Sequence, residues 1–358
     1  MSRAAKITAK TDAGRFFEDF HLGEELVHAT PRTVTSGDVA LYIGLTGSRF
    51  ALQSSDPFAR ACGFERAPLD DLLTFHLVFG KTVPDISLNA VANLGYADGC
   101  FGAPVYPGDT LRAVSRVIGL RENSNRKSGI VHVRTQGRNQ RGESAVDYVR
   151  WVMVRKRDEA SPAPAPAVPD LVDHVPADRL ITPSALDFAH YDFALAGSSH
   201  VWESFAAGER IDHVDGVTIE EAEHMMAARL YQNTARVHFN RHVQAADRIG
   251  RRLVYGGHVM SLARALSFNG LANAVKIAAI NGGRHVNPTF AGDTLYAWSK
   301  ILARWEIPGR RDVGALRLRT LGAKDRSCAD FPDKDAGGNF DPSIVLELDY
   351  TVLIPRST

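Results

Sequence analysis

Three short segments recur in the second half of the chain at a nearly constant distance from their first copies. The pairs are FHLGEEL (20–26) with FAAGERI (205–211), PVYPGDTL (104–111) with PTFAGDTL (288–295), and VRTQG (133–137) with LRTLG (318–322). The offsets are 184 or 185 residues, so one register is kept across a whole half. Chance matches would not keep it, and we interpret the chain as a tandem duplication whose halves share one fold.

A run rich in proline and alanine lies between the two sets of repeats. The segment DEASPAPAPAVPD occupies 158–170, and each of its prolines fixes φ and removes a backbone donor. This composition favours an extended connector. We therefore predict an N-terminal domain at 1–157, a linker at 158–176 and a C-terminal domain at 177–358.

Both halves contain the same order of expected elements. A short amphipathic helix is expected at 36–45 and again at 220–230, and each is followed by a polar loop. A longer apolar stretch comes next, at 69–83 and at 256–275. The second of these is rich in Ala, Leu and Met, which suits a buried helix.

The last part of each half favours β-structure. Runs with β-branched or aromatic residues and partial alternation occupy 110–120, 129–139, 145–154, 294–305, 314–322 and 344–354. The segment 323–342, rich in Pro, Gly and Asp, is expected to be a long loop between the last two strands. The simplest packing is an α+β fold in which each half wraps an antiparallel sheet around a long central helix.

The overall charge and the cysteine content exclude several classes of function. Among 358 residues, 42 Lys and Arg balance 41 Asp and Glu, so no net field favours nucleic acid or an anionic membrane. No apolar run approaches the ~20 residues of a membrane span, and the first residues lack the apolar core of a signal peptide. Three widely separated cysteines indicate neither a disulfide framework nor a zinc site. We expect a cytoplasmic protein.

Five long segments carry a resemblance to a known family. They are VFGKTVPDISLNAVANLGYAD (78–98), YVRWVMVRKRD (148–158), LYQNTARVHFN (230–240), VYGGHVMSLARALSFNGL (254–271) and CADFPDKDAGGNFDPSIVLELDY (328–350). With the tandem repeat, they make the chain similar to the double-hotdog MaoC-like dehydratases. Within that family, the chain most resembles the mesaconyl-CoA hydratases, also called β-methylmalyl-CoA dehydratases.

The resemblance implies a catalytic loop in the second half. The family pattern, roughly G-D-x-N-P-x-H, holds a water that adds to the double bond of an enoyl thioester, while a later glycine N–H stabilises charge on the thioester oxygen. His238 falls on the histidine of this pattern, and Gly256 or Gly257 falls on the glycine. Asn233 stands at the aspartate position. An amide cannot act as a general base at neutral pH, although it can orient a water or a carbonyl.

Other residues are left as candidates for the missing carboxylate. They are Asp187, Glu220 and Asp71, and the sequence does not rank them. His76 and His258 lie in apolar helices and are expected to be packed rather than catalytic.

The first half departs further from the family pattern. Ser48 and Gln53 stand at its aspartate and histidine positions, and Asp70 and Asp71 stand near the glycine, where carboxylates would repel an oxyanion. This predicts one active site with its chemistry from the second half. The first half would help to form the tunnel for the acyl chain and the coenzyme A arm.

The implied substrate carries a free carboxylate, for which a forked arginine side chain is the natural ligand. The candidate substrate-binding residues are Arg236, Asn240, Arg241 and Arg284. The resemblance implies an acyl-CoA substrate, no metal or redox cofactor and a homodimer. The expected reaction is the reversible hydration of mesaconyl-CoA to β-methylmalyl-CoA. The alternatives are an (R)-specific hydratase for other enoyl-CoAs, a hotdog thioesterase and a non-catalytic acyl-CoA-binding protein.

Overall fold

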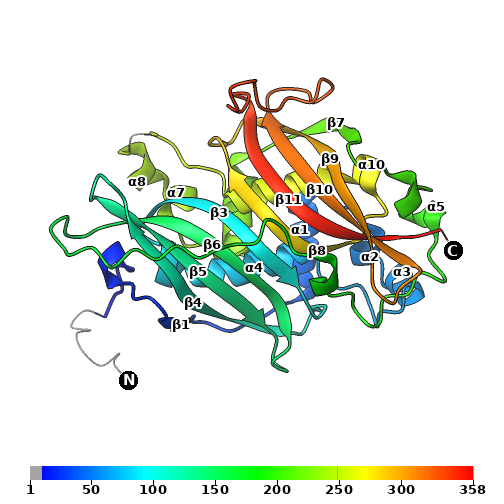
Figure 1. Cartoon of the computed structure of the whole chain (residues 1–358), viewed down its shortest axis with the longest axis horizontal. Coiled ribbons are helices and arrows are strands. Elements are labelled where there is room, and N and C mark those ends of the chain that lie inside the picture. The colour runs from blue at the N-terminus through cyan, green and yellow to red at the C-terminus, as the bar shows by residue number, and fades with distance from the viewer. Residues whose placement is uncertain (1–9, 248, 358) are drawn as a thin grey trace.

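The computed structural model describes residues 10–247 and 249–357. The first nine residues of the predicted N-terminal domain, on which the expectation of no signal peptide rests, lie outside the described residues, as do residues 248 and 358. Within the described ranges, the strands form one antiparallel sheet in the order β1-β4-β5-β6-β3-β8-β11-β10-β9-β7, with β2 beside β4 (Figure 1). They are β1 (Glu25–Val27), β2 (Arg32–Thr33), β3 (Ala90–Phe101), β4 (Thr110–Glu122), β5 (Ser128–Arg138), β6 (Ser144–Arg155), β7 (Arg210–Thr218), β8 (Lys276–His285), β9 (Thr294–Glu306), β10 (Val313–Lys324) and β11 (Ile344–Pro355).

The helices include one long buried helix in each half. The full set is α1 (Ser36–Thr46), α2 (Ala51–Ser54), α3 (Asp56–Ala61), α4 (Asp71–Thr82), α5 (Phe193–Ala196), α6 (Glu221–Leu230), α7 (Arg236–Phe239), α8 (Arg241–Ala245), α9 (Gly256–Leu266) and α10 (Phe268–Leu271). Every residue of α4 is buried, and so are Gly257–Ala265 of α9. Such complete burial needs cover on every side, and these two helices receive it in part from the sheet and from each other.

The strand order is the same on both sides of the β3–β8 contact. Reading outward, β3-β6-β5-β4-β1 on one side corresponds to β8-β11-β10-β9-β7 on the other. Tyr96 lies opposite Gly283 and Cys100 opposite Ala279 in the ladder that joins the halves. One apolar core contains residues of α4 such as Phe75 together with residues of α9 such as Leu262. The halves are therefore joined by both a continuous sheet and a common core.

The sequence missed the two strands that make this junction. All six predicted β-runs are strands, and the predicted loop at 323–342 does separate β10 from β11. β3 and β8 were missed because they are rich in Ala and Gly, which are poor strand formers in isolation. At Gly95 the small residue is required, since a Cβ there would lie 2.4 Å from the Trp151 ring of the neighbouring strand.

The predicted helix at 256–275 is shorter than its apolar stretch. Helix α9 ends at Leu266, well before the predicted end at residue 275, and β8 begins at Lys276. Asn269 and Gly270 have non-helical backbone angles, and Gly270 has a φ of 105°, which only glycine adopts readily. The chain therefore turns there and enters the sheet.

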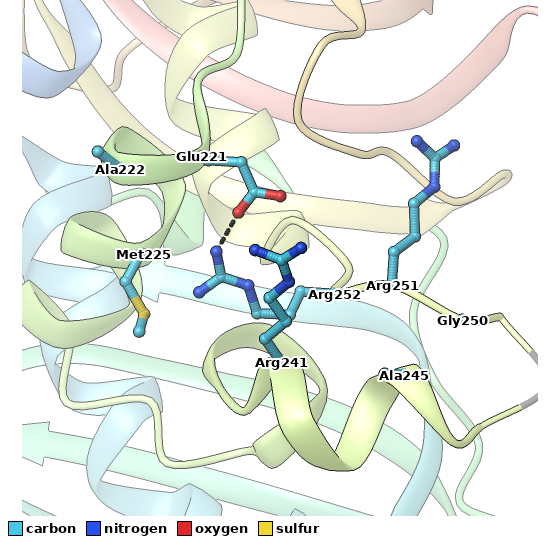
Figure 2. Close-up of a pocket in the computed structure, with 8 residues that line it drawn as sticks. All are labelled: Glu221, Ala222, Met225, Arg241, Ala245, Gly250, Arg251 and Arg252. Carbon is cyan, nitrogen blue, oxygen red and sulfur yellow. Dashed lines mark hydrogen bonds and ion pairs between the residues drawn. The ribbon is translucent and has the colours of Figure 1, made fainter.

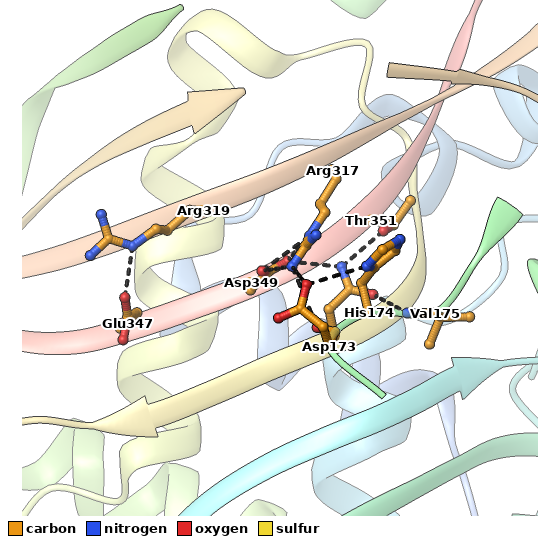
Figure 3. Close-up of polar contacts among 9 residues, drawn as sticks. Asp173, His174, Val175, Arg317, Arg319, Glu347, Asp349 and Thr351 are labelled. Carbon is orange, nitrogen blue, oxygen red and sulfur yellow. Dashed lines mark hydrogen bonds and ion pairs between the residues drawn. The ribbon is translucent and has the colours of Figure 1, made fainter. Parts of the chain in front are cut away.

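The linker lies along the sheet and is hydrogen-bonded to it. Ala167 exchanges two backbone hydrogen bonds of 2.8 Å with Leu120 in β4. Further along, Asp173 receives a bond from Arg317 in β10, and the backbone N–H of Val175 donates to the side chain of Asn281 in β8 (Figure 3). The connector thus contacts strands of both halves.

A buried ion pair also crosses between the halves. Lys276 at the start of β8 lies 2.5 Å from Asp71 at the start of α4, and the Ile277 N–H donates to the second oxygen of the same carboxylate at 2.8 Å. Both charged side chains are less than a tenth exposed. Removing one partner would leave the other charge buried and uncompensated.

We predict that Asp71→Ala lowers the free energy of unfolding by about 3–5 kcal/mol because the Lys276 ammonium loses its partner. The midpoint of urea unfolding measures this change. Asp215→Ala is the matched control, since Asp215 is exposed, and its effect should stay within about 0.5 kcal/mol. Equal midpoints for the two variants would contradict a structural role for the ion pair.

Candidate active site

His238 is held by a short helical loop between α6 and α9. It lies in α7, a single turn, and its Nδ1 is 3.0 Å from the backbone oxygen of Leu253. The Leu253 N–H in turn donates to the oxygen of Val237 at 3.0 Å. A carbonyl oxygen only accepts, so Nδ1 must carry the proton and donate it. This fixes the tautomer and leaves Nε2 as a free acceptor.

Burial keeps this imidazole neutral. It lowers the pKa of His238 to about 4, although the bond to Leu253 acts in the opposite direction. At neutral pH the ring is therefore in the form that can accept a proton. A base of low pKa is weak in absolute terms, but it is fully available at physiological pH.

The N-terminus of α9 lies beside this histidine. Gly256 and Gly257 are the first two residues of the helix, where backbone N–H groups have no partner within the helix. Within 10–247 and 249–357, neither amide donates a hydrogen bond to another group. Tyr255, which precedes them, has its ring centroid 5.5 Å from that of His238. Two free donors at a helix N-terminus suit a developing negative charge.

A second histidine completes the group. His285, the last residue of β8, lies so close to Gly256 that a Cβ on this glycine would be 2.3–2.5 Å from its ring atoms. Its Nε2 is 3.2 Å from the hydroxyl of Tyr96. Burial, with a smaller contribution from His238, lowers the pKa of His285 to about 4. Two neutral imidazoles thus flank the free amides.

His285 was not among the residues predicted from the sequence. The repeat offered a weak signal, because the register of the PxxxGDTL turns aligns His285 with Phe101, a buried apolar residue. This replacement of an apolar residue in the first copy by a histidine in the second copy could have indicated a functional residue.

Aromatic rings surround the group. The Tyr255 ring centroid is 5.8 Å from that of Tyr231 and 5.5 Å from that of Phe79. Burial raises the pKa of the Tyr255 hydroxyl well above its usual value, so this group remains protonated. In such a low-dielectric setting, hydrogen bonds to a charged reaction intermediate are stronger than in water.

Asn233 and Asn240 use their side chains to shape the loop. The Asn233 side chain is buried, and its Oδ1 accepts the N–H of Ala235 at 3.0 Å. Asn240 caps α8 by accepting the N–H of Val243 at 3.1 Å. Both are turn or cap contacts of a kind common for Asn, and they position α7 with its histidine between them.

The three candidate arginines lie in different places. Arg236 is exposed at the start of α7, and Arg241 lines a pocket beside α8. Arg284 lies next to His285 in β8, but neighbouring residues of a strand face opposite sides of the sheet. Its side chain binds Glu347 at 2.8 Å and covers the Phe340 ring. The structure therefore does not bring Arg284 together with His238.

Two of the three proposed carboxylate partners bind other groups, and the third is exposed. Asp71 pairs with Lys276, Asp187 accepts the N–H of Ala189, and Glu220 is exposed at the start of α6. His76 and His258 are fully buried, as their apolar helices predict. His76 contacts Ser261 at 3.0 Å, and His258 contacts Glu223 at 2.7 Å.

The corresponding region of the first half is filled. Gln53, at the position of His238, donates to the Val275 oxygen at 2.8 Å. Asp70 caps α4, and Asp71 binds Lys276 where the second half has its free amides. The cavity among these residues and Arg264 has a volume of about 10 Å³. It can hold at most about one water, so no substrate fits there.

Known proteins resemble the chain over nearly its whole length. A model of the family described as mesaconyl-CoA hydratase matches residues 2–327. The chain belongs to the mesaconyl-CoA hydratase family. It is 66% identical over 350 residues to the β-methylmalyl-CoA dehydratase of Chloroflexus aurantiacus, covering 98% of this chain and 99% of that protein. It is 61% identical to the mesaconyl-CoA hydratase of Cereibacter sphaeroides, covering 97% and 100%.

Solved structures confirm the fold. A MaoC domain dehydratase from Chloroflexus aurantiacus superposes with a TM-score of 0.96 at 66% identity, covering 98% of this chain and all of that one. A double-hotdog protein from Mycobacterium tuberculosis has a TM-score of 0.77 at 25% identity, covering 96% and 99%. The resemblance to the family and the double-hotdog fold that it implies are both confirmed. Within the described ranges, no helix combines the length and the apolar character that crossing a bilayer requires.

We predict that the imidazoles of His238 and His285 titrate near pH 4. Both pKa values are below the ordinary value near 6.5, so between these pH values the unfolded chain binds protons that the folded chain does not. The resulting stability is fully present above pH 6.5 and is lost as the pH falls towards 4. NMR of histidine ring carbons, assigned with His238→Gln and His285→Gln, gives the midpoints. A midpoint near 6.5 for either ring would show that it is solvated.

Proposed function

We propose that the chain catalyses the reversible addition of water to mesaconyl-CoA, giving β-methylmalyl-CoA. The family match and the two relatives above 60% identity support this reaction. The structural observation that carries it is the proximity of a neutral His238 to the free amides of Gly256 and Gly257. A hydratase needs a base for the water and donors for the thioester oxygen, and this group supplies both.

In the proposed mechanism, His238 Nε2 accepts a proton from water as the water oxygen attacks the β-carbon of the enoyl thioester. The electron pair of the double bond moves onto the thioester oxygen, which the two amides stabilise. The protonated His238 then returns the proton to the α-carbon, and the carbonyl forms again. Water has been added, and the imidazole is neutral at the end, ready for another cycle.

We assign His285 the positioning role that an aspartate has in the family pattern. Asn233 is occupied by its turn, whereas His285 has a ring nitrogen beyond the one that contacts Tyr96. Its neutral ring can hydrogen-bond the attacking water without adding charge. Its ring occupies the space that a Cβ on Gly256 would need, so it lies directly against the N-terminus of α9.

The remaining parts of the proposal concern the whole molecule. We assign the chemistry to the C-terminal domain (177–358), whereas the N-terminal domain (1–157) supports it and helps to form the substrate tunnel. The filled counterpart site in the first half supports this division. Proton transfer and hydrogen bonding account for the reaction without a metal or redox cofactor. We further propose a cytoplasmic homodimer, which size-exclusion chromatography with light scattering tests.

The experiment is to incubate the purified protein with mesaconyl-CoA in EDTA and to follow loss of the enoyl absorbance and formation of the hydrated product. Turnover of crotonyl-CoA at the same rate would favour a hydratase for simple enoyl-CoAs. Free thiol release without loss of the enoyl absorbance would favour a thioesterase. Tight binding without turnover would favour an acyl-CoA-binding protein.

We predict that His238→Ala lowers kcat by at least ~100-fold, the usual effect of losing a general base. Initial rates with mesaconyl-CoA measure it. His190→Ala is the control, because His190 is exposed and lies outside the group. Activity of His238→Ala equal to that of wild type would remove this residue from the mechanism.

We predict that Gly256→Ala lowers kcat by about 10²–10³-fold, because the added methyl group would displace His285 and the amide donors. Steady-state kinetics and the melting temperature should be measured together. Gly44→Ala is the matched control, since a Cβ at this helical position meets nothing within 4 Å. Unchanged kcat in a folded Gly256→Ala protein would argue against an oxyanion site here.

A further inference from the structure

A pocket lined with arginines lies next to the His238 loop. It has a volume of about 720 Å³ and lies between α6, α8 and the segment 250–252 (Figure 2). Arg241, Arg251 and Arg252 line it together with Ala222, Met225 and Ala245. Cationic groups and apolar surface are thus combined in one hollow.

Among the residues that the structure describes, only one of the three arginines has a carboxylate partner. Arg252 forms an ion pair with Glu221, which also lines the pocket. Arg251 stacks over the ring of Phe290 at 3.6 Å. In the part of the chain that the structure describes, neither Arg241 nor Arg251 binds an acidic side chain. Glu221 compensates the charge of Arg252, so the lining of the pocket keeps the positive charge of the other two guanidinium groups. The forked donors of guanidinium groups match phosphate oxygens.

Residues that line the pocket are neighbours in sequence of residues that hold the proposed catalytic group. Leu253, whose oxygen fixes the tautomer of His238, directly follows Arg252. Two residues of extended chain span at most about 7 Å, so the backbone of Arg251 lies within that distance of Leu253. On the opposite wall, α8 begins directly after Asn240, which closes the His238 turn. The walls of the pocket are therefore continuous in the chain with the two residues that hold and close the His238 turn.

We infer that this pocket binds the phosphates at the nucleotide end of the coenzyme A thioester. This inference rests on the proposed hydratase function and adds the residues that recognise the carrier. The pantetheine arm would run from the arginines past Leu253 to the N-terminus of α9. Met225 and the two alanines offer apolar surface to the adenine ring. Inorganic phosphate has the same chemistry, so the test has to separate the two ligands.

The kinetic test compares two substrates that differ only in the nucleotide. The variant is Arg241→Gln with Arg251→Gln, and the substrates are mesaconyl-CoA and mesaconyl-pantetheine. Because a charged hydrogen bond contributes about 1.5–3 kcal/mol, KM for mesaconyl-CoA should rise by about 10- to 100-fold or more. We expect kcat to change less than twofold and kcat/KM for mesaconyl-pantetheine to remain unchanged. An unchanged KM for mesaconyl-CoA, or equal losses with both substrates, would overturn the inference.

A binding test separates this inference from the proposed reaction. Calorimetric titration of the wild-type protein with 3′,5′-ADP should give saturable binding that the double variant loses. Arg60→Gln, at an exposed arginine of α3, should bind like wild type. Binding retained by the double variant, or matched in affinity by inorganic phosphate, would overturn the assignment. If wild type binds 3′,5′-ADP at the arginines but hydrates neither thioester, the reaction proposal fails while the phosphate site remains.

Discussion

The packing of α4 against α9 inside one continuous sheet is the constraint on which the site depends. Each helix is buried along almost its whole length, and the two helices share one core that contains residues of both halves. Pairing of β3 with β8 brings the two sheets edge to edge and gives the helices a common core. The same pairing places His285, at the end of β8, against the first residue of α9. The geometry of the proposed site is therefore a consequence of how the halves join.

Duplication creates two equivalent positions, and their residues have diverged in opposite directions. In the second half, glycines leave backbone donors unsatisfied and two neutral histidines lie beside them. In the first half, Asp71 and Lys276 satisfy each other and close the cavity. Unsatisfied donors cost stability, whereas a compensated ion pair holds its surroundings in place. One position keeps backbone donors that a ligand could use, and the other contributes to the interface between the halves.

The sequence predicted the parts of the structure that depend on local pattern or on long repeats. The tandem architecture, six strands and the long loop all followed from such signals, whereas the candidate His238 came from the resemblance to the family. It could not predict the roles of β3 and β8, because Ala and Gly are selected there by close neighbours such as Trp151. His285 was missed for the same reason, since its importance lies in contacts with Gly256 and Tyr96, far away in the chain. Arg284 was a candidate substrate ligand, but strand alternation places its side chain on the opposite face of the sheet from His285, where it binds Glu347.

The path of the linker has a consequence for how copies of the chain can associate. The connector crosses the outer side of the sheet, where His174 stacks on Trp305 and Asp173 binds Arg317 (Figure 3). An exposed face of a sheet is a surface on which the sheet of a second molecule could stack. Here the linker of the same chain occupies part of that face, and because it is tethered, its effective concentration there is fixed and does not depend on protein concentration. A second copy would have to displace it or approach from another direction.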